Sequence, residues 1–106
     1  MVAELSLPAN ATLADLQVYV AELERQRGFD AQSPIDKCLL LGEEVGELFK
    51  PVRTSEGLKI DVPGGEVGAE LADVLIYLCA IANRYDLDLE AEFRAKEALN
   101  KTRVWK

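Results

Sequence analysis

The chain has 106 residues, about half of them apolar (49%), which suits a single domain spanning residues 1–106 and excludes a disordered or low-complexity tail. Nineteen acidic and twelve basic residues give a formal net charge of −7, which argues against a nucleic-acid polymer or a membrane surface as partner, because both attract basic patches. No apolar run approaches the roughly 20 residues of a membrane span, and the N-terminus lacks a signal-peptide pattern, so we expect a cytoplasmic protein.

The first predicted element is a helix that begins at Thr12. Thr12 and Asp15 have the spacing of a capping box, in which each side chain bonds the other residue's backbone N–H. Gly28 is the predicted stop, because glycine readily takes the left-handed conformation that ends many helices. Between Thr12 and Gly28, apolar residues recur at helical spacing: Leu13, Leu16, Val20 and Leu23.

A second helix is predicted to begin at Ser33–Pro34, an N-cap followed by proline in the first turn. We expect it to end at Lys50, because Pro51 disfavours helical geometry in the residue before it. Residues 51–64 contain two prolines and two glycines and are predicted to form a loop, with one short strand-like piece at Leu58–Val62.

A third helix is predicted from Gly65 to Tyr85, and a fourth from Asp86 or Asp88 to about Thr102. The pattern indicates an all-α fold, a four-helix bundle. Four helices with this many apolar positions seldom bury them alone, so we expect the bundle to be completed by homo-oligomerisation, as a homodimer or homotetramer.

The residue types exclude several kinds of site. The chain has no histidine, which removes di-iron sites built on Glu-x-x-His pairs, zinc sites built on His and Cys, and His-based acyl transfer. Cys38 and Cys79 lie in apolar helical segments without a CxxC pattern, so we expect buried free thiols.

Four acids carry the strongest chemical signal. Glu44 and Glu47 are three residues apart on the second helix, and Glu70 and Asp73 repeat this spacing on the third. Residues three apart share a helical face, so antiparallel packing would bring the four carboxylates together.

Such a cluster needs a counter-charge, and all-oxygen ligands favour Mg²⁺, with Mn²⁺ as a substitute. A solvated acidic face is the alternative that these residues leave open. A helical oligomerisation or partner-binding module without turnover would have such a face.

The segments GEEVGEL and AELADVLIYLCAIA, at residues 42–48 and 69–82, resemble the MazG-like all-α nucleoside triphosphate (NTP) pyrophosphohydrolases, whose motifs are EExxE and ExxD. The similarity runs from Leu13 to Arg103. It is particularly close to the dCTP-pyrophosphatase type, which shares the EVGEL and DVLIYL motifs. It implies Mg²⁺-dependent hydrolysis of an NTP or dNTP to the monophosphate and pyrophosphate, in nucleotide-pool housecleaning. Phosphoribosyl-ATP pyrophosphohydrolase is the alternative within the same enzyme class.

The resemblance also implies roles for individual residues. The metal ligands would be Glu44, Glu47, Glu70 and Asp73. The residues expected to contact substrate are Tyr77, Lys96, Asn100, Phe29 and Arg103.

Two features leave the reaction details open. Some dCTP enzymes carry a histidine in the first helix, where this chain reads LQVYVAEL, so the preferred base is not predicted. Glu43 is a candidate general base, because it adjoins the ligand Glu44. A neighbour on a helix points about 100° away, so an outward, solvated Glu43 is the alternative.

Overall fold

The computed structural model describes residues 4–58 and 65–104. These residues form four helices and no strand, which confirms the all-α prediction. The helices are α1 (Leu13–Arg27), α2 (Pro34–Ser55), α3 (Val67–Arg84) and α4 (Leu89–Asn100). None of the helices in the described ranges is long and apolar enough to cross a membrane.

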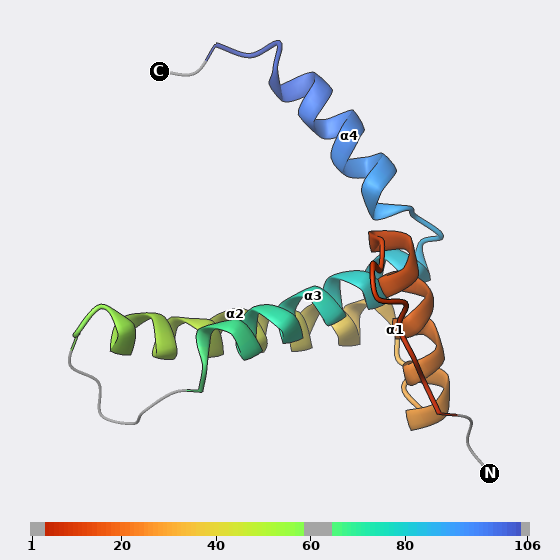
Figure 1. Ribbon diagram of the computed structural model, residues 1–106, viewed down its shortest axis with the longest axis horizontal. Helices are drawn as coiled ribbons and strands as arrows, with labels where there is room; N and C mark the ends of the chain where they lie inside the picture. Colours follow the sequence, from red (N-terminus) through yellow and green to blue (C-terminus); the bar gives the residue numbers. More distant parts are fainter. Residues whose placement is uncertain (1–3, 59–64, 105–106) are drawn as a thin grey trace.

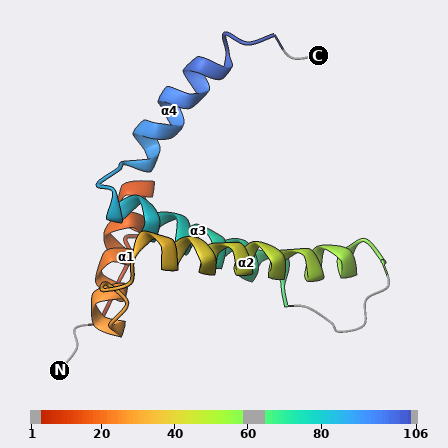
Figure 2. The same ribbon diagram turned by 180° about the vertical axis from the view of Figure 1, so that it is seen from behind.

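Two long helices, α2 and α3, form the centre of the molecule. They run antiparallel and side by side in both views (Figures 1 and 2), and α1 crosses them near the start of α2 and the end of α3. After a tight turn, α4 points away from the α2–α3 pair (Figure 1). The face of α2 that carries the acids is therefore covered by α3 and not by α4.

The helix starts follow the predicted local chemistry. Thr12 and Asp15 form a reciprocal capping box at α1, with backbone-to-side-chain bonds of 2.8 and 3.1 Å. Ser33 and Asp36 form a second one at α2, at 2.9 and 3.1 Å. Asp88 caps α4 by accepting from two backbone N–H groups of its first turn. Each cap satisfies N–H groups that the helix itself leaves without acceptors.

The predicted end of the second helix at Lys50 is wrong. Helix α2 continues to Ser55, with Pro51 inside it. Proline lacks an N–H and therefore removes one hydrogen bond, whereas the residues after it can still donate to the preceding turn. Gly57, at φ = 74°, provides the left-handed stop instead.

The predicted loop at residues 51–64 is correspondingly shorter. Residues 51–55 are helical, and only residues 56–66 connect α2 to α3. Of the strand-like piece expected at Leu58–Val62, residues 59–62 lie outside the described residues. The extra turn and a half of α2 extends the helix pair beyond the acidic motif.

The apolar core lies where α1 meets α3. It is built from Val20 and Leu23 of α1 and Cys79 and Ala80 of α3. Cys79 is a buried free thiol, as expected, but Cys38 is exposed and that part of the prediction is wrong. One step along a helix turns about 100°, so residue 38 cannot share the buried direction of its neighbour at position 37.

A buried charge network ties three helices together. Glu24 of α1 is 3% exposed. Its carboxylate accepts two hydrogen bonds from Arg84 of α3, at 2.8 and 2.9 Å, and pairs with Lys37 of α2 at 3.0 Å. Burial raises the pKa of Glu24, but the hydrogen bonds from Arg84 and Lys37 outweigh it, so the pKa lies below its usual value. The ionised carboxylate is therefore the state that the fold stabilises.

A second polar contact fixes the turn between α3 and α4. Gln17 of α1 donates to the Asn83 side chain at 3.1 Å and to the Leu87 carbonyl at 2.8 Å. It also accepts from the Leu89 N–H at 2.9 Å. This side chain thus positions the start of α4 relative to α1.

We expect Arg84→Met to lower the free energy of unfolding by about 3 kcal/mol, because it removes one partner of a buried ion pair and leaves Glu24 poorly compensated. Urea denaturation measures this change. The matched control is Arg94→Met, which breaks the exposed pair of Arg94 with Glu90 and should cost less than about 0.5 kcal/mol. Equal losses in the two variants would contradict the structural role of the network.

Candidate metal centre

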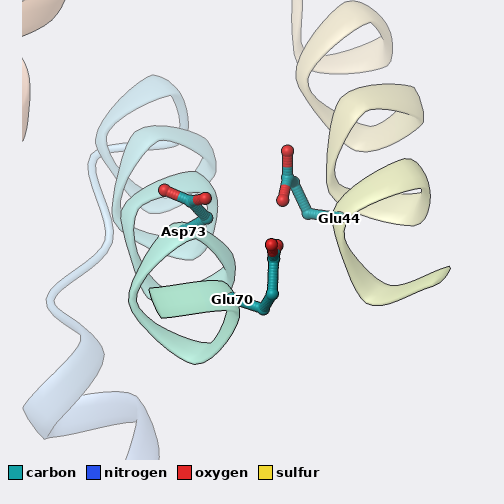
Figure 3. A group of neighbouring side chains, drawn as sticks. All are labelled: Glu44, Glu70 and Asp73. Carbon is teal, nitrogen blue, oxygen red and sulfur yellow. The ribbon is translucent and has the colours of Figure 1, made fainter. Parts of the chain in front are cut away.

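Three carboxylates meet between α2 and α3. Glu44 points from α2 toward Glu70 and Asp73 of α3 (Figure 3), and one oxygen of each lies within 4.8 Å of the others. The antiparallel packing of the two helices produces this convergence, since the two motifs lie on facing surfaces. The structure therefore brings together three of the four acids that the sequence singled out.

Charge repulsion is concentrated at Glu44. Burial raises its pKa, and so do a hydrogen bond with Glu70 and the negative charges of Asp73, Glu70 and Glu47. The ionised form is thus disfavoured in the folded protein without a cation. A divalent ion at this point would offset the repulsion.

The donor set fits a hard divalent cation. Carboxylate oxygens from two rigid helices are the ligands that such ions prefer. The cluster of Glu44, Glu70 and Asp73 could therefore hold a metal ion.

The other two acids of the first motif lie outside this convergent set. The Glu47 side chain is 51% exposed and pairs with Lys50 at 3.3 Å, although its charge still reaches Glu44. Glu43 is exposed, and its charge contributes to raising the pKa of Tyr77.

A pocket of about 180 Å³ adjoins the carboxylates. Glu44 and Asp73 line it, together with the two predicted aromatic residues, Phe29 and Tyr77. Burial raises the pKa of the Tyr77 hydroxyl, as do the charges of Glu44 and Asp73, so this hydroxyl stays protonated beside the acids. The pocket thus combines acidic and aromatic side chains.

Lys37 also lines this pocket, and the sequence analysis missed it. The residue is only 3% exposed, and its Nζ lies 5.0 Å from the ring centre of Phe29 and 5.4 Å from that of Tyr77. The available signal was its position seven residues before Glu44, two helical turns along the same face.

The residues predicted on and after α4 lie elsewhere. Lys96 and Asn100 line a groove of about 410 Å³ between α1, α3 and α4, which contains none of the clustered acids. Within residues 4–58 and 65–104, Asn100 Oδ1 is one of two buried side-chain polar atoms without a hydrogen-bond partner. Arg103 follows α4 and is exposed. In one copy of the chain, α4 does not bring these three residues to the carboxylates.

The chain is similar in fold and sequence to a solved structure, iMazG from Vibrio DAT 722. The TM-score is 0.63 and the sequences are 32% identical, over 90% of this chain and 99% of that one. The chain belongs to the MazG-like superfamily of all-α NTP pyrophosphohydrolases. This confirms the resemblance noted in the sequence. No family model matches the chain, and no match was found among curated proteins.

For this MazG-like protein without metal at pH 7, we expect Glu44→Gln to raise the Tm by about 2–5 °C, because it removes one of three crowded negative charges. Mg²⁺ should stabilise the wild-type protein, by about 2.7 kcal/mol at a hundred times its Kd. The variant should lose most of this gain. Thermal unfolding with and without Mg²⁺ measures both effects.

The sign of the pH dependence follows from the raised pKa of Glu44. The folded state binds the proton of the Glu44 carboxyl more tightly than the unfolded state does. The ionised Glu44 therefore lowers the stability of the metal-free protein as the pH rises above the usual pKa of 4.5, and this effect vanishes well below that pH. Glu22→Gln, at a half-buried position of α1 outside the carboxylate cluster, is the control and should behave like the wild-type protein. A Tm that responds to neither Mg²⁺ nor Mn²⁺ would argue against the metal centre.

Proposed function

We propose that this protein is a Mg²⁺-dependent NTP pyrophosphohydrolase, a hydrolase that acts on phosphoric anhydrides. It converts an NTP or dNTP and water into the monophosphate and pyrophosphate, in nucleotide-pool housecleaning. The observation that carries the proposal is the convergence of Glu44, Glu70 and Asp73 in a chain of the MazG-like superfamily.

The metal ligands in this proposal are Glu44, Glu70 and Asp73, with Glu47 as the fourth once its side chain turns from Lys50. The exposed Glu47–Lys50 pair contributes little stability, so this change costs little. A bound Mg²⁺, or Mn²⁺ in its place, would polarise the phosphoryl oxygens and neutralise charge on the departing pyrophosphate.

The reaction also needs a proton acceptor. Water attacks the α-phosphorus and forms a new P–O bond, while the bond from that phosphorus to the bridging oxygen breaks and pyrophosphate leaves. We assign the proton of the attacking water to a carboxylate oxygen of Glu43, which adjoins Glu44 and carries no metal in this scheme. A solvated, outward Glu43 is the alternative, and the rate of Glu43→Gln separates the two.

Substrate contacts come from two regions. Phe29 and Tyr77 line the pocket next to the carboxylates and offer ring faces to a base. Lys96, Asn100 and Arg103 offer donors to phosphate and sugar oxygens. Since α4 points away from the α2–α3 pair, we propose that these last three act on the site of a second copy.

The exposed apolar surface supports a homodimer or homotetramer. Phe93 of α4 is 71% exposed and Leu99 is 51% exposed, and Leu75 and Leu78 of α3 are also exposed beside the groove that α4 borders. Apolar side chains gathered along one groove favour association, because a partner removes them from water.

The activity test is a panel of triphosphates, extended to phosphoribosyl-ATP, with Mg²⁺ and with pyrophosphate and monophosphate quantified. We expect Glu70→Gln to lower kcat/KM at least about a hundredfold, since it removes a charged ligand from the site that stabilises the transition state. Glu22→Gln should retain wild-type turnover. Release of orthophosphate alone, or full activity of Glu70→Gln, would refute the proposed reaction.

The assembly test is light scattering after size-exclusion chromatography. The wild-type protein should be a dimer or tetramer, and Phe93→Asp should dissociate it, because a buried unpaired charge is costly. The matched control is Val104→Asp, which changes an apolar residue that is 87% exposed and lies outside the groove. A monomeric wild-type protein would rule out the shared site.

A further inference from the structure

The network around Glu24 contains more positive than negative charge. Two cations, Arg84 and Lys37, contact one carboxylate directly, and the carboxylate of Asp36 interacts with both cations only from a greater distance, so close compensation of the second positive charge is incomplete. Among the described residues, Glu24 is the only carboxylate in an ion pair with either cation. An uncompensated buried charge is costly, and a ligand that supplies electron density would reduce that cost.

Arg84 has no donor left for such a ligand. A guanidinium has five N–H groups, and five hydrogen bonds of 2.8 to 2.9 Å engage them. Two go to the Glu24 carboxylate and three to backbone carbonyls, those of Gln32, Ala80 and Phe29. The role of Arg84 is therefore to hold Glu24 in place.

Lys37 is in the opposite situation. Its ammonium has three N–H donors, and one carboxylate oxygen, of Glu24, lies within 3.0 Å. The rings of Phe29 and Tyr77 lie at cation–π distance and attract the charge without providing strong acceptors. Buried donors without acceptors are costly, and Lys37 lines the pocket beside the metal centre.

The pocket suits a flat ring better than a phosphate. Its volume is about 180 Å³. Leu23, Ile76 and Ala80 line it together with the two aromatic rings. A phosphate would meet a single available ammonium next to the carboxylates, whereas phosphates are bound best by several charged donors. A neutral acceptor on an aromatic ring has no such conflict.

We propose that Lys37 determines substrate specificity by donating a hydrogen bond to a carbonyl oxygen of a nucleobase in the pocket that Phe29 and Tyr77 line. Lys37 and Glu44 are seven residues apart on one face of α2, about 10 Å along the axis, so the sugar spans from the base to the phosphates at the metal centre. Cytosine, uracil, thymine, guanine and hypoxanthine carry a ring carbonyl, and adenine does not. Adenine offers this ammonium only ring nitrogens as acceptors, so we expect the pocket to favour carbonyl-bearing bases over adenine.

This inference rests on the proposed function, and its main test measures kcat/KM for dCTP, dUTP, dGTP, dITP and dATP. The pair dITP and dATP is matched in size and differs at one ring position, a carbonyl in the first and an amino group in the second. The wild-type protein should favour the best carbonyl-bearing substrate over dATP by at least about tenfold. Lys37→Met, which keeps the chain length without the charge, should reduce this ratio several-fold, and Lys101→Met should leave it unchanged.

A merely structural Lys37 would lower kcat/KM for all bases by one factor and leave the ratio as it was, which would overturn the inference. A wild-type preference for dATP would overturn it without any variant. Inorganic pyrophosphate, which has no base, should bind the wild-type protein and Lys37→Met equally. Weaker binding of pyrophosphate to the variant would assign Lys37 to a phosphate instead.

Calorimetric titration of dCMP, dUMP, dGMP and dAMP separates the two proposals. Base-selective binding that Lys37→Met abolishes, in a protein that hydrolyses no triphosphate, would refute the proposed function and support the pocket. Triphosphate hydrolysis without discrimination among bases would support the proposed function and refute the role of Lys37.

Discussion

Helix packing in this protein forces like charges together. Glu44, Glu70 and Asp73 repel one another, yet the antiparallel contact of α2 with α3 leaves their oxygens within 4.8 Å. The raised pKa of Glu44 is the electrostatic consequence. Such an arrangement opposes folding and survives only because other contacts hold the two helices in register.

The contacts that oppose this repulsion lie near the start of α2 and at the end of α3. Glu24 of α1 joins Arg84 of α3 and Lys37 of α2 in a network that is mostly buried. The repelling carboxylates and the ion-pair network of Glu24 thus lie at different positions along the helices. One pocket is lined both by the acids Glu44 and Asp73 and by the buried ammonium of Lys37, which lies two helical turns before Glu44 on α2. This arrangement suits a ligand whose two ends differ in charge, as the phosphates and the base of a nucleotide do.

The small core explains why α4 is so exposed. The largest helix contact is between α2 and α3, and the apolar cluster of α1 and α3 involves few large side chains. Within residues 4–58 and 65–104, no other part of the chain buries Phe93 and Leu99 of α4. We propose that a second copy of the chain buries these side chains, and that Lys96 and Asn100 then contact the substrate at the site of that copy.

The sequence by itself determined what depends on near neighbours: the helix caps at Thr12 and Ser33, the helical periods, and the spacing of three that places two acids on one face of each of α2 and α3. These are local interactions, or consequences of one helical turn, and neighbouring residues specify them completely. Pro51 was misjudged because the preference of one residue is weaker than the packing of a whole helix. Only the tertiary structure decided that Lys37 is buried while Cys38 is exposed, that Glu47 turns to Lys50, and that α4 leaves the bundle. These outcomes depend on which surfaces α1 and α3 cover, and residues far apart in the sequence determine that coverage.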